Sequence, residues 1–329
     1  MKIAESEIAL HGESAFEYSG LASLDDLSSA RWIRLFSHLE QFQARFLAHE
    51  SRFRSAQYPW PRDPLHTWSR VWEYPYAAYH ILKWRRELPR QMLPRVVDLG
   101  SGVTSFPFFL GRCGCQVVAV DADLICARDF SRAIKCFKTR HGRVDFALAQ
   151  GGLLPFRNAS VDCVYCISVL EHVPDPRELI DEVARVLKPG GTLVITVDIS
   201  ADSRSELTPQ TFNVLRCAVL RSFQFCVSER VFHPSRLLTT NSSPCLPKRT
   251  TPSEFAGWAL RTAANRARHR DVSGKTLTLD SILKVGRRLI MMSSPYAQPE
   301  PLVCCYGAVL TRSKSDAEQS GNRELPEHQ

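Results

Sequence analysis

The stretch RVVDLGSG (residues 95–102) runs from a β-branched apolar segment into an acid and two glycines, and it decides the fold class. Four more short apolar segments follow it, rich in Val and Ile: QVVAV (116–120), RVDFALA (143–149), DCVYCIS (162–168) and TLVITV (192–197). Strands buried on both faces of a sheet have this nearly continuous apolar character. The segments therefore predict neighbouring strands of one buried sheet.

Helical patterns lie between these strands, and the best marked begins after Asp175. Asp175 can cap a helix, Pro176 suits its first turn and Glu178 stands where a capping-box acid belongs. The sequence KPGG (188–191) is expected to end this helix, after an apolar stripe of Leu179, Val183, Val186 and Leu187. Alternating strands and helices predict an α/β fold with a mostly parallel sheet and helices on both faces.

The rest of the chain has weaker patterns. TPQTFNVLRCAVL (208–220) predicts a helix, and SFQFCVSERVF (222–232) and PLVCCYGAVLTR (301–312) predict strands. Trp72, Tyr74 and Tyr76 either belong to the core, which we favour, or line a pocket. We expect a helical N-terminal extension and candidate substrate cap at 1–90, a ligand-binding core at 91–200, completion of the sheet with a basic insertion at 201–312, and a disordered tail at 313–329.

Composition places the chain among ordinary globular proteins, with 44% hydrophobic and 23% charged residues in 329. No apolar run approaches the roughly 20 residues that span a bilayer, and the first residues lack a signal-peptide pattern. Eleven cysteines without regular spacing predict a reducing, cytoplasmic compartment. Cys163 and Cys166 should point to opposite faces of one strand, so we expect that they do not bind a metal together. No group of His and Cys has the spacing of zinc ligands, so we expect no metal site elsewhere.

Charge is unevenly distributed. The net charge is +8, yet residues 204–288 contain 15 Lys/Arg and only 5 Asp/Glu. Such a segment either binds an anionic partner or is a solvated surface, and its composition leaves both interpretations open. The sequence gives no indication of oligomeric state.

Ligands of parallel sheets bind where the strands end, so Asp98, Gly100 and Gly102 are the first candidate site residues. The glycines allow the backbone to turn tightly and approach a ligand. A dinucleotide would place its pyrophosphate here, which the Asp98 carboxylate disfavours, and Ser105 replaces the third glycine of the dinucleotide motif. Both features argue against an NAD-dependent dehydrogenase. The Asp98 carboxylate could instead hold a cationic amino group.

The exits of the next strands supply further polar candidates. Asp121 follows the glycines by about 20 residues, where an acid can accept hydrogen bonds from ribose hydroxyls. The alternative is that Asp121 or Asp123 caps the following helix. After the fourth strand come Glu171 and His172, and His172 either acts as a base or orients a loop.

Taken together, four pieces carry a family resemblance: VVDLGSG, VVAVDAD, LLPFRNASVDCVYCISVLEHV and RVLKPGGTLVIT. They cover about a third of the chain and resemble the class I S-adenosylmethionine-dependent methyltransferases of the methyltransferase type 11 group. The resemblance implies a Rossmann-like sheet of seven strands with a reversed final strand. It also implies S-adenosyl-L-methionine as the cofactor.

The resemblance assigns roles to particular positions. Asp98, Gly100 and Gly102 would hold the methionine end of the cofactor and Asp121 its ribose. Gln150 stands where the family usually has an Asp that accepts a hydrogen bond from adenine, and its side-chain carbonyl can do the same. The full set expected to bind the cofactor is Asp98, Gly100, Ser101, Gly102, Asp121, Ala122, Gln150, Gly151 and Ser168.

Methyl transfer from an activated sulfonium needs alignment and exclusion of water, and a base only if the acceptor must lose a proton. His172 is the candidate catalytic residue, with Glu171 behind it, and we expect His172 to brace the loop. The preferred acceptor is a small molecule such as a sugar or lipid, methylated on O or N. The alternatives are an RNA or protein methyltransferase that uses residues 204–288, and a cofactor-binding scaffold without catalysis.

The basic segment generates a test of its own. Because residues 204–288 contain no recognised RNA-binding motif, we predict no strong nucleic-acid binding at physiological salt. Fluorescence anisotropy with tRNA and rRNA fragments measures this directly. Submicromolar binding that is lost as salt rises would contradict the prediction, because release of counterions gives that dependence.

Overall fold

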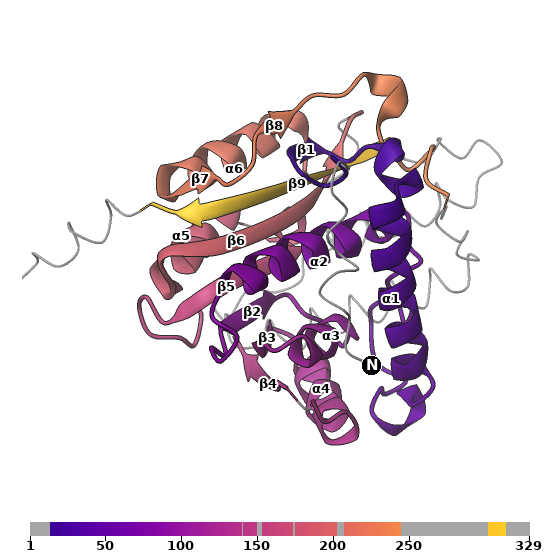
Figure 1. The fold of residues 1–329 in the computed structure, drawn as a ribbon, viewed down its shortest axis with the longest axis vertical. Helices are drawn as coiled ribbons and strands as arrows, with labels where there is room; N and C mark the ends of the chain where they lie inside the picture. Colours follow the sequence, from indigo (N-terminus) through magenta and orange to yellow (C-terminus); the bar gives the residue numbers. More distant parts are fainter. Residues whose placement is uncertain are drawn as a thin grey trace, which may run out of the picture.

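A computed structural model of the chain describes residues 14–139, 141–149, 153–173, 175–202, 207–244 and 302–313. These residues form a sheet of nine strands with helices on both faces (Figure 1). The strands are β1 (Ser19–Leu21), β2 (Arg95–Leu99), β3 (Gln116–Asp121), β4 (Arg143–Leu148), β5 (Val161–Ile167), β6 (Leu187–Ser200), β7 (Phe223–Phe225), β8 (Glu229–Arg230) and β9 (Val303–Arg312). The helices are α1 (Ala30–Leu47), α2 (Arg70–Glu87), α3 (Phe106–Arg112), α4 (Leu124–Cys136), α5 (Pro176–Val186) and α6 (Pro209–Ser222).

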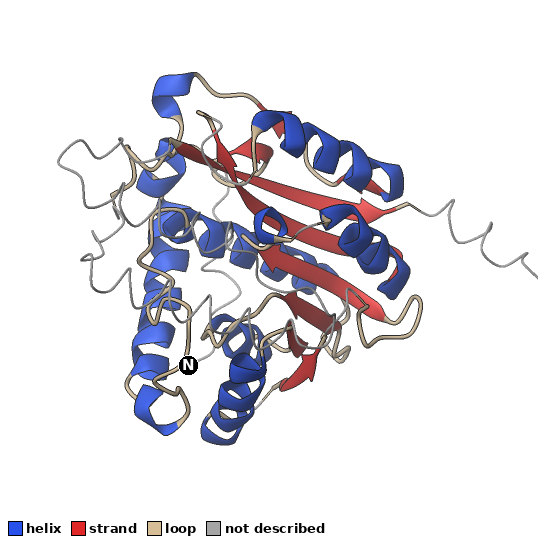
Figure 2. Ribbon diagram, turned by 180° about the vertical axis from the view of Figure 1, so that it is seen from behind, coloured by secondary structure: helices blue, strands red, loops and turns tan. Residues whose placement is uncertain are grey.

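The predicted α/β fold is confirmed. The strand order is β4-β3-β2-β5-β6-β9-β1-β8, and the first five of these strands are parallel. β9 runs antiparallel to β6, as the reversed final strand predicts. Side chains alternate between two apolar layers: α2, α3 and α4 pack on one face of the sheet, and α5 and α6 on the other (Figure 2).

The strand count differs from the seven expected. The outer edge of β9 is long enough to hold two short strands: β7 pairs with it near Arg312, and β1 pairs near Gly307. β8 then joins β1. The segment at 222–232 was predicted as one strand, but it forms β7 and β8 with a break between them.

The start of α5 confirms the predicted cap, because the Asp175 carboxylate accepts a hydrogen bond from the backbone N–H of Arg177 at 3.0 Å. The helix ends at Val186, and Leu187 is already the first residue of β6, so its place in the helical stripe was wrong. Val161 pairs with Leu187 and Cys163 with Thr192. The four residues between Leu187 and Thr192 therefore bulge out of the ladder, which lets the helix pass directly into the strand.

Cys163 and Cys166 pack in the two opposite apolar layers, as predicted from their spacing on β5. The ten cysteines among the described residues are all free. Within the same part of the chain, every helix is too short or too polar to cross a membrane. The predicted tail beyond residue 313, and residues 204–206 and 245–288 of the basic segment, lie outside the described residues.

The helix α2 is buried along most of its length and crosses the face of the sheet in front of β5, β6 and β9 (Figure 1). Trp72 and Tyr76 stack with ring centroids 4.4 Å apart and are fully buried, so these aromatics belong to the core. The Trp72 indole N–H donates to Asp26 at 2.8 Å, and the Tyr18 hydroxyl donates to the same carboxylate at 2.5 Å. The N-terminal residues are thereby fixed to the sheet.

Gly307 of β9 lies directly beneath these rings. A Cβ atom at this position would lie 2.7 Å from Trp72 and 2.8 Å from Tyr76, and neither ring can swing away in a packed core. We predict that Gly307→Ala lowers the free energy of unfolding by about 1–3 kcal/mol, the usual cost of overpacking. Urea denaturation measures it, with Thr311→Ala on the same strand as control. A loss no larger than that of the control would contradict the close packing.

Candidate functional site

The loop after β2 is shaped by backbone hydrogen bonds to the neighbouring strand. The N–H groups of Gly100 and Ser101 both donate to the carbonyl of Val120, at 2.9 and 3.0 Å. Gly100 and Gly102 have φ values of +71° and +53°, which favour glycine. A Cβ at Gly100 would lie 2.4 Å from the side chain of Val169. Ser101 is buried, and its hydroxyl donates to the Gly102 carbonyl at 3.1 Å.

Asp98 is buried at the end of β2. Burial raises the pKa of its carboxyl, the Tyr165 hydroxyl lowers it and the nearby Asp121 carboxylate raises it, which together bring this pKa to about 8. A buried carboxyl without a cation prefers its neutral form. A ligand ammonium group at this position would supply the missing positive charge and return Asp98 to its ionised form.

Asp121 joins the exit of β3 to the glycine loop. Its Oδ2 accepts from the N–H of Gly102 at 2.8 Å and its Oδ1 from the N–H of Asp123 at 2.9 Å. The cap of α4 is Asp123, which accepts from the N–H of Ile125 at 2.6 Å. Each Asp121 oxygen keeps a further lone pair for a hydroxyl donor. Ala122, beside it, is exposed.

Three leucines at the exits of β3 and β4 are unusually exposed for apolar side chains: Leu124 by 52%, Leu148 by 37% and Leu153 by 68%. Gln150, predicted to bind adenine, and Gly151, predicted to bind the cofactor, lie outside the described residues. The leucines precede and follow them along the chain. Exposed apolar surface at these two strand exits fits a flat ring system better than a charged group.

The N-terminal extension supplies site residues that the sequence did not reveal. The Tyr58 hydroxyl accepts from the N–H of Val103 at 2.9 Å, and the Arg54 guanidinium donates to the carbonyl of Val103 at 2.5 Å. Trp60 lies beside Gly102 and is 46% exposed. These residues are some 40 positions before the loop they contact, and no periodic pattern marks them.

A second group of polar residues lies at the exits of β5 and β6. Ser168, directly after β5, is buried with φ of +47°, and its hydroxyl donates to Glu73 at 2.6 Å. Arg70 forms an ion pair with Glu73 and a hydrogen bond with Ser168. Ser168, predicted to contact the cofactor, is therefore bound to α2 of the extension.

Glu171 and His172 are adjacent but differ in environment: Glu171 is buried and His172 is exposed. Oε1 of Glu171 accepts from the N–H of Asp198 at 3.2 Å, while Oε2 has no hydrogen-bond partner among the described residues. Burial raises the pKa of Glu171 to about 7, although His172 lowers it. Burial, with Glu73 and Glu171 close by, also holds the pKa of Asp198 well above its ordinary value. Among the described residues, three carboxyl groups therefore lie close to Arg70: those of Glu73, Glu171 and Asp198.

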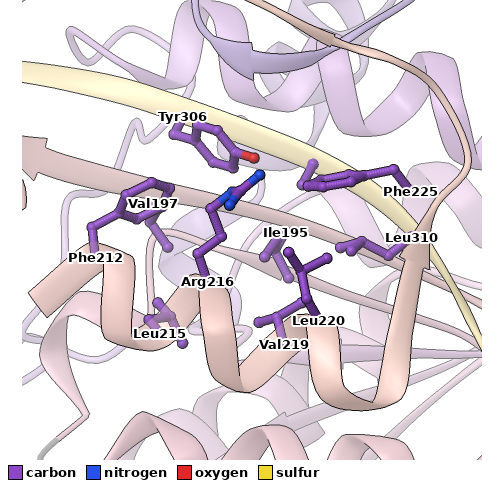
Figure 3. Close-up of a pocket in the computed structure, with 11 residues that line it drawn as sticks. Ile195, Val197, Phe212, Leu215, Arg216, Val219, Leu220, Phe225, Tyr306 and Leu310 are labelled. Atoms are coloured by element: carbon purple, nitrogen blue, oxygen red, sulfur yellow. The ribbon is translucent and has the colours of Figure 1, made fainter.

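The space between α6 and the sheet is too small to be a ligand site. Figure 3 shows Phe212, Arg216 and Leu220 of α6 facing Tyr306 and Leu310 of β9. The gap has a volume of about 10 Å³, which holds at most one water. The Tyr306 hydroxyl donates to Glu229 at 2.9 Å, and Arg216 pairs with the same carboxylate. These contacts hold α6 on the sheet.

Comparison with known proteins agrees with the geometry of the glycine loop. Residues 97–195 match the family described as "Methyltransferase domain". A ubiquinone biosynthesis O-methyltransferase of Xylella fastidiosa (strain 9a5c) is 35% identical over 104 residues, 31% of this chain and 41% of the relative. A demethylmenaquinone methyltransferase of Clavibacter sepedonicus is 35% identical over 120 residues, 34% of this chain and 46% of the relative.

The chain therefore spans less than half the length of these curated relatives. Among solved structures, the (4+2)-cyclase SpnF aligns over 84% of this chain and 94% of its own, with a TM-score of 0.45 and 17% identity. That likeness bears on neither the fold nor the activity. Residues 97–195 form a class I methyltransferase domain, and the cofactor of this domain is S-adenosylmethionine.

The pKa of Asp98 gives a test at the site. It lies near 8 in the folded protein and near 3.9 in an unfolded chain, so folding takes up a proton and stability falls as pH rises between these values. A bound ammonium group favours the ionised carboxylate. We therefore predict that affinity for S-adenosylhomocysteine rises from pH 6 to pH 8, by at most about tenfold per unit.

Asp98→Asn removes the titrating group and serves as the control. Its affinity should be lower and nearly constant over the same pH range, while its stability relative to the unmutated protein should increase with pH. Calorimetry and urea denaturation measure the two quantities. Parallel pH profiles for both proteins would contradict the assignment.

Proposed function

We propose that the chain is an S-adenosylmethionine-dependent methyltransferase that acts on a small-molecule acceptor. The observation that carries this proposal is the buried Asp98 carboxyl beside the glycine loop, within the segment that matches methyltransferase domains. The named relatives methylate O in ubiquinone biosynthesis or act on demethylmenaquinone. Their names support a small acceptor with an apolar body, and the similarity covers only the domain that holds the cofactor.

The residues fit the cofactor in three places. Asp98 would bind its ammonium group, and the free lone pairs of Asp121 would accept from the ribose hydroxyls. The adenine ring would pack against Leu124, Leu148 and Leu153. The side-chain carbonyl of Gln150 would accept a hydrogen bond from the adenine amino group. The bound cofactor supplies an activated methyl group on a sulfonium. Tyr58 and Trp60 would limit access of water from the side of the extension.

On the acceptor side, Glu171 is the better candidate for a base. Its pKa near 7 leaves it partly ionised at neutral pH, which suits proton transfer, and its buried Oε2 has no hydrogen-bond partner among the described residues. We therefore assign proton acceptance to Glu171 and a bracing role to the exposed His172. Arg70 and Glu73 hold Ser168 in its left-handed conformation beside this position.

The alternative of an RNA or protein substrate gains no support from the described part of the basic segment. Residues 207–244 contain four arginines, and two of them form ion pairs, Arg216 with Glu229 and Arg236 with Asp25. Two compensated charges leave little positive field for a polyanion. The other alternative, a cofactor-binding scaffold without catalysis, differs from an enzyme in having no turnover, so a turnover measurement distinguishes the two.

Turnover tests the proposal. The full chain, incubated with methyl-labelled S-adenosylmethionine and a panel of phenols, quinols, amines and sugars, should label at least one small acceptor. Labelling confined to RNA or protein would contradict the small-molecule assignment. Binding of the cofactor without any labelling would favour the scaffold.

With an acceptor that must lose a proton, Glu171→Gln should lower turnover by roughly 10²–10⁴-fold, as loss of a general base does. His172→Gln keeps a hydrogen-bonding group on the same loop and should retain most activity. Affinity for S-adenosylhomocysteine should change little in either variant. The reverse order of activities, in two folded proteins that bind the cofactor, would assign the base to His172.

A further inference from the structure

A cavity of about 240 Å³ lies between α1, α3 and the residues that follow α4. Figure 1 shows α1, α3 and α4 in the same part of the molecule. The cavity is lined by Phe108 and Arg112 of α3, the helix that follows the glycine loop, and no residue of that loop lines it. None of its lining residues takes part in the site described above.

The inner wall of the cavity is aromatic. Phe46 of α1 lies 5.5 Å from Phe108 of α3 and 4.9 Å from Phe137, measured between ring centroids, and Phe108 lies 5.6 Å from Phe137. Phe42 completes this wall. An apolar cavity of about 150 Å³ accepts benzene. The larger volume here has room for one ring with a polar substituent.

The rim of the cavity is positively charged. It includes Arg45, Arg112 and Lys138, which are exposed, and His49. Within the part of the chain that the structure describes, none of these three cations has a carboxylate within 4.0 Å. The two acids nearest to Arg45 in sequence already have other partners: Glu40 of α1 contacts His66 at 3.0 Å, and Glu50, just after the helix, pairs with Arg54 at 3.0 Å and with Arg62. Among the described residues, none of those that line the cavity is acidic, so its field favours an anion.

We propose that this cavity binds a small organic anion, namely a single aromatic ring or a short apolar body that carries a carboxylate or a phosphate. The phenylalanines would cover the apolar body, and the guanidinium groups of Arg45 and Arg112 would pair with the anionic head. Volume limits the body to about one ring, and charge excludes amines. The proposal concerns a site separate from the cofactor and does not depend on methyl transfer.

Ligand-observed NMR and calorimetry on the full chain test the chemistry. The probes are benzoate, phenyl phosphate, benzyl alcohol and benzylamine, which share one ring and differ in the head. Benzoate or phenyl phosphate should bind with a Kd on the order of 1 mM or lower, more weakly at high salt. Whichever of these two anions binds more tightly shows whether the cavity prefers a carboxylate or a phosphate. Benzylamine binding as tightly as the anions, or no binding of either anion at 10-fold higher concentration, would overturn the proposal.

A variant places the binding at this cavity. Arg45→Gln with Arg112→Gln removes two exposed cations, and the affinity for the anion should fall about tenfold, the effect of two exposed ion pairs. The matched control is Arg221→Gln, which removes an exposed arginine on α6. Affinity for S-adenosylhomocysteine should be the same in all three proteins. Equal anion binding by the double variant and the control would show that the anion binds elsewhere.

Discussion

Parallel pairing of β2 with both β3 and β5 is the constraint on which the site depends. Val97 pairs with Val118 on one side and Val164 on the other, so the three strands end at one edge of the sheet. Asp98, Asp121 and Ser168 come from these ends, and the contacts of the glycine loop with Val120 and Asp121 join two of them. A shift of register by one residue would move Asp98 to the opposite face.

The N-terminal extension completes this edge. α2 is fixed to the sheet by its buried aromatics, and it carries Arg70 and Glu73 to Ser168 across the end of β5. The buried carboxylate of Glu73 remains ionised because Arg70 neutralises it, and the pKa of Glu73 is lowered accordingly. Burial raises the pKa values of Glu171 and Asp198, and the more distant Arg70, which lowers both, does not offset this effect. One cluster thus contains a carboxyl group with a lowered pKa, that of Glu73, and two with raised pKa values, those of Glu171 and Asp198. Such a difference in pKa suits proton transfer.

The local signals in the sequence predicted the central fold. The β-branched segments became β2 to β6, and the Asp175 cap and the reversed β9 follow from residues within a few positions of each element. What the sequence did not reveal depends on distant contacts. β1 is three residues long and forms only because β9 offers an edge, and Glu73 meets Ser168 across 95 positions of chain. The roles of Asp98 and Asp121 toward the cofactor stay predictions, as does that of Gln150.

The most direct test of the account is calorimetry of the purified chain with S-adenosylmethionine, S-adenosylhomocysteine and NAD, and with Asp121→Ala beside the unmutated protein. The account predicts that both adenosyl compounds bind and NAD does not. It also predicts that Asp121→Ala weakens their binding by about 10- to 150-fold, the effect of losing about 1.5–3 kcal/mol from hydrogen bonds to a charged group. Tight binding of NAD with no response to the adenosyl compounds would contradict it.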